Sequence, residues 1–328
     1  MNPALLMIGG LIVFWVSMAP VVILPTYIIP DQPSPEWLAR SDLAERGRAI
    51  YIREGCTYCH TQYVRPQEWE FGASRIAEEG DYYREAPHLL GSNRIGPDLS
   101  QEGGQHANDW HVAHFRNPRS TRPDSIMPRY THLTEDELAA IIAYVQSLGG
   151  RAGAERVMVQ LKWRPRAIAA YESGPYKNIA WLHANIPAGW RPLPNPYPAT
   201  AASLARGERV FQSYCIGCHG PVGDGVGKAA QWLYPPALNF THLRRNLVDR
   251  KYIGGILYYQ IMNGIGGTAM PYFKTELESA KIWDVSNYVA VNFIGWDDSN
   301  MEPRGIDAAS ETPGEGANDP PIRELIAP

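Results

Sequence analysis

The sequence predicts a mainly α-helical chain, with one membrane-spanning helix at the N-terminus followed by two small helical domains of the same plan. Three observations lead to this fold class. Residues 1–30 carry no charged side chain, and a C-x-x-C-H run occurs twice, at 56–60 and at 215–219. Each run follows a short helical pattern and precedes a longer one, so the order of the elements repeats along the chain.

The uncharged segment 1–30 is predicted to be a transmembrane anchor. Residues 3–19 are almost wholly apolar, and residues 21–24 extend the run past Pro20. About 20 apolar residues suffice to cross a bilayer as a helix. A cleaved signal peptide is the alternative, but the segment has no basic n-region and no clear A-x-A site. We therefore expect a retained anchor, with the lipid bilayer as one partner of the chain.

The two C-x-x-C-H runs contain all four cysteines of the chain. Two thiols at this spacing can each form a thioether to one vinyl group of the same porphyrin, and the next residue then presents an imidazole to the iron. A thioredoxin-like redox pair or half a zinc site are the alternatives, but neither needs an adjacent histidine twice. The sequence thus predicts two covalently bound c-type haems, held by Cys56, Cys59, His60, Cys215, Cys218 and His219.

Each haem motif lies between a short helix and a closing helix, which is the framework of a class I cytochrome c domain. Ser41 is expected to cap a helix through about Arg53, and residues 134–137 form a capping-box pattern before an apolar helix. The second copy is predicted over 203–214 and 276–293. We therefore divide the chain into an anchor (1–30), a first domain (31–150), a second domain (201–297) and two further segments.

These two further segments are a connector and a tail. The connector, residues 151–200, is rich in proline and aromatic residues; we expect 156–170 to be helical in part, despite Pro165, and 193–198 to be extended. The tail, residues 298–328, is acidic and rich in Pro and Gly. The net charge of −4 gives no indication of a nucleic-acid partner.

A sixth iron ligand is expected from a Met-Pro loop in each domain. Met127 is the only methionine between His60 and the first closing helix, and His/Met ligation suits electron transfer. Met270 lies in a glycine-rich loop, whereas its competitor Met262 lies in a packed helical pattern. The iron ligands are thus predicted as His60 with Met127 and His219 with Met270. Four other histidines compete in the first domain, and we expect most of them at the surface: His106, His111, His114 and His132.

A proximal histidine needs an acceptor that orients its second ring nitrogen. The segments 96–99 and 235–238 are the expected providers. By resemblance to class I cytochromes c, in which a proline carbonyl fills this role, the acceptors would be Pro97 and Pro236.

The first half of the chain resembles a known family over about residues 5–149. The segments that carry the resemblance are C-T-Y-C-H-T-Q-Y-V-R-P at 56–66, P-H-L-L-G-S at 87–92, R-I-G-P-D-L at 94–99, His111 with His114, N-P-R at 117–119 and Met127-Pro128. They resemble the membrane-anchored monohaem cytochrome c subunit (subunit II) of C-type, cbb-type haem–copper oxidases. The resemblance implies docking or haem-propionate contacts at Tyr63, Arg65, His88, Ser92 and Arg94, with Arg65 and Arg94 favoured because arginine pairs bidentately with carboxylates.

The second haem domain departs from that family, whose usual subunit II has one haem. The resemblance implies an electron-transfer subunit without catalytic residues of its own. Because c haems are attached outside the cytoplasmic membrane, we expect the chain after residue 30 on the periplasmic face of a bacterial inner membrane. Its partners would be a polytopic haem–copper catalytic subunit with b haems, and as donor a small c-type cytochrome or a quinol-oxidising complex. The alternatives are a subunit of a nitric oxide reductase or another quinol-oxidising complex, a dihaem cytochrome c peroxidase, and a free-standing membrane-anchored shuttle.

Overall fold

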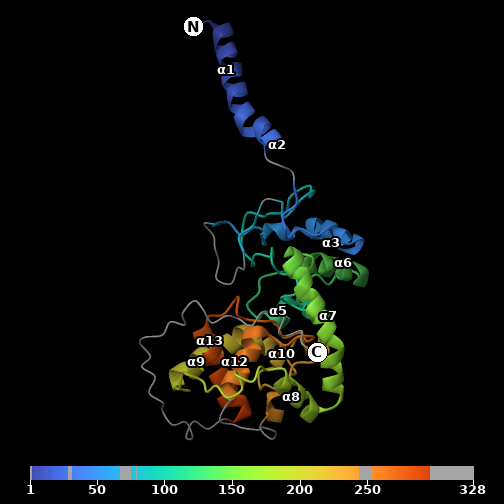
Figure 1. Ribbon diagram of the computed structural model, residues 1–328, viewed down its shortest axis with the longest axis vertical. Coiled ribbons are helices and arrows are strands. Elements are labelled where there is room, and N and C mark those ends of the chain that lie inside the picture. The colour runs from blue at the N-terminus through green and yellow to red at the C-terminus, as the bar shows by residue number, and fades with distance from the viewer. Residues whose placement is uncertain (1, 29–31, 67–74, 79, 244–252, 296–328) are drawn as a thin grey trace.

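The computed structural model describes residues 2–28, 32–66, 75–78, 80–243 and 253–295. Every regular element within these ranges is a helix, as the sequence predicts. The acidic tail from residue 298 lies outside the described residues. Figure 1 shows one long N-terminal helix that projects from a body of two lobes.

The N-terminal helix runs over Pro3–Ile28 in three consecutive parts. They are α1 (Pro3–Met18), the π-helical turn η1 (Ala19–Ile23) and α2 (Leu24–Ile28). The Asn2 side chain caps its first turn. The change to π-helical turns coincides with Pro20, which has no N–H to donate to the helical ladder. The helix is long and apolar enough to cross a membrane, and none of its residues is buried. It is therefore a candidate membrane anchor.

The first lobe is built on two crossing helices that bracket the first haem motif. Its elements are α3 (Asp42–Arg53), η2 (Cys56–Tyr58), α4 (Asn108–Arg116), α5 (Pro118–Thr121) and α6 (Glu135–Gln146). Ser41 caps α3, and the capping box of Thr134 and Glu137 opens α6, both as predicted. The crossing is close at Gly47, where a Cβ would lie 1.8 Å from the Ala140 carbonyl oxygen. Only glycine therefore fits at this point of α3.

The second lobe repeats this crossing with other residues. Its elements are α9 (Ala201–Val210), η4 (Phe211–Cys215), α10 (Ile216–His219), η5 (Ala230–Trp232), η6 (Phe240–His242), α12 (Ile253–Asn263), α13 (Ser279–Val289) and η8 (Ala290–Ile294). A Cβ at Gly207 of α9 would lie 2.2 Å from the Asp284 carbonyl oxygen of α13. The two lobes therefore share a glycine-dependent helix crossing, which supports the predicted repeat.

The connector is more helical than expected. It forms α7 (Gly150–Glu172) and α8 (Pro175–Ala184), and α7 continues through Pro165. Figure 1 shows α7 running alongside both lobes. The Gln160 side chain of α7 accepts a hydrogen bond of 2.7 Å from the Gly267 N–H, in the loop that leads to Met270. Residues 193–198 are non-helical, as predicted, and Asn195 binds the Asn287 side chain at 2.6 Å.

The two lobes meet directly where α5 of the first touches α10 of the second. A Cβ at Gly217, inside the second C-x-x-C-H run, would lie 2.1 Å from the Ser120 carbonyl oxygen. Nearby, Asp109 of α4 accepts bonds from the Arg164 side chain of α7 and from the Tyr234 N–H, at 3.3 Å and 3.2 Å. The second haem motif therefore rests on the first domain.

Candidate functional site: two c-type haem sites

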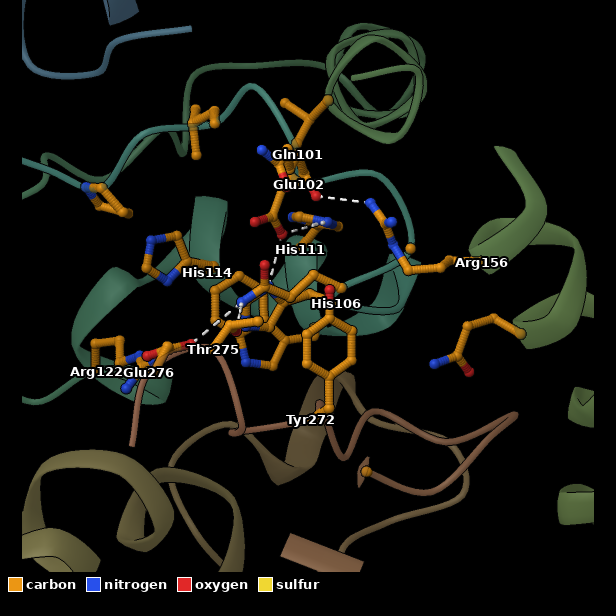
Figure 2. Close-up of a pocket in the computed structure, with 18 of the residues that line it drawn as sticks. Gln101, Glu102, His106, His111, His114, Arg122, Arg156, Tyr272, Thr275 and Glu276 are labelled. Atoms are coloured by element: carbon orange, nitrogen blue, oxygen red, sulfur yellow. Dashed lines mark hydrogen bonds and ion pairs between the residues drawn. The ribbon is translucent and has the colours of Figure 1, made fainter. Parts of the chain in front are cut away.

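A cavity of about 1620 Å³ lies beside the first haem motif and reaches the second domain. Cys56, Cys59, His60 and Met127 all line it. Its other walls come from α4, from the connector and from the second domain, and Figure 2 shows part of them. In that view His106, His111 and His114 lie on the first-domain side, while Tyr272, Thr275 and Glu276 come from the second domain. The predicted ligands of the first haem thus border one large cavity.

The first proximal histidine has the acceptor that we predicted. His60 Nδ1 lies 2.8 Å from the Pro97 carbonyl oxygen. This contact occupies one ring nitrogen and leaves Nε2 for an iron. Gly96 makes the approach possible, because a Cβ there would lie 2.3 Å from His60 Cε1. The segment R-I-G-P-D-L therefore orients the imidazole through both its glycine and its proline.

The second proximal histidine is oriented by a different residue from the one predicted. His219 Nδ1 lies 3.2 Å from the carbonyl oxygen of Leu238, so the prediction of Pro236 as acceptor is wrong. The expected segment 235–238 does supply the acceptor, but from its last residue. The ring also stacks on Phe240, with 4.4 Å between centroids and 12° between planes. Burial lowers the pKa of His219 to about 4, so the imidazole stays neutral, which is the form that binds a metal.

The surroundings of three of the four cysteines favour the protonated thiol. Burial raises the pKa values of Cys56, Cys215 and Cys218 to about 12. A redox-active C-x-x-C pair needs a lowered thiol pKa, and a zinc site needs thiolates. Among the described residues no cluster of three or more His, Cys, Asp or Glu is arranged to hold a metal ion. These thiol pKa values therefore give no support to a redox-active pair or a zinc site.

The two predicted methionine ligands differ in how the structure places them. Met127 lies in the wall of the cavity, and its sulfur is 3.2 Å from His114 Nε2. Met270 is half-buried against the core of the second domain, and its N–H donates to the Thr268 hydroxyl at 3.1 Å. Its competitor Met262, on α12, packs against the same core. Ligation by Met127 and by Met270 stays a prediction.

The other histidines of the first domain are mostly not at the surface, contrary to expectation. His106 and His111 are buried, and His114 is largely covered; of the four, only His132 is exposed. His106 Nδ1 lies 2.6 Å from the buried Glu102 carboxylate, and His111 Nε2 lies 3.6 Å from it. His111 and His114 lie on α4 and His106 lies just before it, and all three line the cavity, which the spacing along the sequence did not indicate.

The two arginines expected to contact a partner or a propionate do not line the described part of the cavity. Arg94 instead binds the loop that follows the first haem motif: its Nε donates to the Thr61 hydroxyl at 2.8 Å and another guanidinium nitrogen to the Tyr63 carbonyl at 2.6 Å. Arg65 is exposed. Contacts of Arg65 and Arg94 with a partner or a haem propionate remain predictions.

One part of the cavity wall joins the two domains and was missed by sequence reasoning. Arg122, just after α5, forms an ion pair with Glu276 and lies over the Tyr214 ring, 4.4 Å from its centroid. Gln105 also reaches Thr275 at 3.4 Å. These partners are more than 90 positions apart in the chain, so no local pattern could have found them.

Comparisons with known proteins agree with a cytochrome. The chain is 25% identical over 274 residues to one of the subunits of the nicotinate dehydrogenase of Pseudomonas putida, covering 80% of this chain and 19% of that protein. The chain thus spans about a fifth of that relative's length. It is 36% identical over 92 residues to cytochrome c6 of a Synechococcus species, covering 28% of this chain and 72% of that protein.

A solved structure was also matched, a chain of the reducing HAO-like protein complex of Kuenenia stuttgartiensis. The identity is 18% and the TM-score 0.24, over 80% of this chain and 97% of that one. A TM-score this low does not establish a common fold.

Two family models match separate parts of the chain. Residues 1–140 match the model described as cytochrome c oxidase, mono-heme subunit/FixO, and residues 202–289 match cytochrome c oxidase, cbb3-type, subunit III. The predicted resemblance to the monohaem subunit of cbb-type oxidases is thereby confirmed. The chain is FixO-like over residues 1–140 and carries a second cytochrome c domain, of the cbb3 type, over residues 202–289.

Proposed function

We propose that this chain carries two covalently bound c haems and passes single electrons from a donor to the catalytic haem–copper subunit of a cbb3-type oxidase. The observation that carries the proposal is the pair of equivalent sites. In each, a C-x-x-C-H histidine has its Nδ1 bound to a backbone carbonyl, at 2.8 Å for His60 and 3.2 Å for His219. Both motifs also follow a helix that crosses a closing helix at a glycine.

A bound haem would supply reversible one-electron chemistry at its iron. The residues of this chain would hold it: the two cysteines of each motif would attach it covalently, the histidine would bind its iron, and Met127 or Met270 would complete the iron coordination. Two Met-Pro loops, one in each domain, favour filled coordination and hence transfer over catalysis. The chain itself would have no substrate chemistry.

The direction of transfer follows from the family of the first domain. We place delivery to the catalytic subunit at the first domain, since that domain is FixO-like. The second domain would then receive the electron from a small c-type cytochrome or a quinol-oxidising complex. Both domains would lie on the periplasmic face, because c haems are attached outside the cytoplasmic membrane, with Pro3–Ile28 as the anchor.

The first experiment is gentle detergent purification of this chain from its native membrane, followed by haem spectra of whatever accompanies it. We expect co-purification of b-type haem and a polytopic subunit that reduces oxygen. If the co-purifying partner reduces nitric oxide instead, the chain would be a subunit of a nitric oxide reductase. The chain alone with two low-spin c haems would favour the shuttle, and carbon monoxide binding to the reduced chain would favour the peroxidase.

The ligand assignment has its own test in Met127→His and Met270→His. Each change should lower the reduction potential of one haem, because an imidazole stabilises ferric iron better than a thioether does. Redox titration of the purified chain measures both potentials. An unchanged potential in either variant would remove that methionine from the proposed ligand set.

A further inference from the structure

His114 contacts Met127, the predicted sixth ligand of the first haem, and the proposed function leaves this histidine without a role. It lies on α4, lines the cavity and is largely covered. Its Nε2 is 3.2 Å from the Met127 sulfur, and its Nδ1 is 2.6 Å from the Thr121 hydroxyl oxygen. The imidazole therefore bridges α5 and the Met-Pro loop.

The position of the His114 ring is fixed by stacking as well as by its nitrogens. Trp110, one turn earlier on α4, stacks on it with 4.6 Å between centroids and 10° between planes. Trp110 in turn stacks on His106, with 3.7 Å between centroids, and His106 binds Glu102. A ring held in this way has little rotational freedom, so its edge points at a defined place.

The proton on His114 follows from its two partners. A neutral imidazole has one donor nitrogen and one acceptor nitrogen. The Thr121 hydroxyl lies 3.1 Å from the Pro118 carbonyl oxygen, to which it can also donate, but His114 Nδ1 is its nearer acceptor. When the hydroxyl donates to Nδ1, the proton of the ring lies on Nε2 and points at the sulfur. With the proton on Nε2, the contacts of His114 with the Met127 sulfur and with the Thr121 hydroxyl are both hydrogen bonds. With the proton on Nδ1, a lone pair of Nε2 would point at the sulfur.

We propose that His114 is the positioning residue of Met127: its Nε2–H donates to the thioether sulfur, holds that sulfur in place and raises the reduction potential of the first haem. The inference rests on the proposed function, in which Met127 binds the iron. A hydrogen bond to the sulfur withdraws electron density from it. The weaker donor stabilises ferric iron less, so the ferrous form is favoured.

The expected size follows from the strength of one hydrogen bond. A net contribution of about 1 kcal/mol corresponds to about a fivefold change in the equilibrium constant for reduction, or about 40 mV at 59 mV per tenfold for one electron. His114→Leu should therefore lower the potential of the first haem by about that amount. His114→Gln, whose amide can still donate to the sulfur and accept from Thr121, should restore most of it.

The test is a redox titration of the full chain in detergent, in a Met270→His background. In that background the methionine–iron absorption band of the ferric protein reports on the first haem alone. Thr121→Val deletes the hydroxyl that orients His114, so it should also lower the potential of the first haem. This second variant keeps the inference testable if His114→Leu does not fold. His183→Leu is the matched control, because that imidazole lies on α8 and does not line the cavity, and it should leave the potential unchanged.

The outcomes separate this inference from the proposed function. A wild-type potential in His114→Leu with the band intact overturns the role of His114 and leaves Met127 as ligand. A band that survives Met127→Leu removes Met127 from the ligand set, and with it the basis of this inference. Loss of the low-spin spectrum in His114→Leu, but not in Met127→Leu, would make His114 itself the iron ligand. That result would overturn the positioning role of His114 and the assignment of Met127 as ligand.

Discussion

Gly96 illustrates how a single residue beside a haem motif determines the position of a ligand. A Cβ at this position would lie 2.3 Å from the His60 ring. Gly96→Ala should therefore push the imidazole away from the Pro97 carbonyl and destabilise the first domain by about 1–3 kcal/mol, the usual cost of overpacking. Denaturant unfolding monitored by haem absorbance measures the loss. Gly189→Ala is the control, since nothing lies within 4 Å of a Cβ there, and equal effects in the two variants would contradict the argument.

His111 makes the stability of the first domain depend on pH. Burial lowers its pKa from 6.5 to about 4, although Glu102 opposes the shift and His106 adds to it. Between these two values the unfolded chain binds a proton that the folded chain does not. The free energy of unfolding should therefore fall as the pH is lowered from 6.5 to 4, by up to about 3 kcal/mol.

The measurement for His111 is denaturant unfolding of the full chain at several pH values. Below about pH 4.5, protonation of Glu102, whose pKa is lowered by His106 against the effect of burial, should add to the loss. His111→Gln should flatten the dependence between pH 6.5 and 4. The same slope in the variant and the wild type would show that another group is responsible.

At the scale of elements, the contact of α10 with α5 places the second haem motif against the first domain. A Cβ at Gly217 would lie 2.1 Å from the Ser120 carbonyl oxygen and 3.1 Å from Thr121 Cα. Gly217→Ala should therefore separate the two helices. Electron transfer slows steeply with distance, so we expect slower exchange between the haems while haem content stays at two per chain.

Flash-induced reduction of the purified chain, followed by optical re-equilibration between the haems, measures this exchange. Gly207→Ala serves as a comparison, because it strains the crossing of α9 with Asp284 of α13 inside the second domain. It should lower stability without a specific loss of exchange. An unchanged exchange rate in Gly217→Ala would mean that the α5–α10 contact does not set the route.

Local capping patterns predicted the helix boundaries better than the apolar patterns did. Ser41 and Thr134 cap α3 and α6 as expected, because a side chain that binds an N–H two or three residues ahead is a local interaction. The extent of α7 was underestimated because Pro165 ordinarily ends a helix. Contacts such as the Gln160 bond to Gly267 come from distant parts of the chain and help to hold α7 in place.

At the scale of the whole molecule, the candidate membrane helix is separate from the two lobes, and each lobe has its own apolar core. The helix Pro3–Ile28 has no buried residue, whereas each lobe has a large apolar cluster. A variant lacking residues 1–30 should therefore keep both haems and both potentials but leave the membrane fraction. Membrane flotation and haem quantification of the two forms measure this. A truncated chain that still floats with membranes would point to a further attachment.

The sequence by itself determined the fold class and the family resemblance, and it predicted the haem chemistry that we propose, since these depend on local patterns in the chain. Thioether spacing, the neighbouring histidine and the Met-Pro loops are local patterns, as is the apolar N-terminal run. Only the tertiary structure decided which carbonyl orients His219, which histidines are buried and which side chain approaches Met127. Those outcomes depend on how helices distant in sequence pack together. The residues next to Leu238, His111 and His114 in the chain therefore do not predict these contacts or this burial.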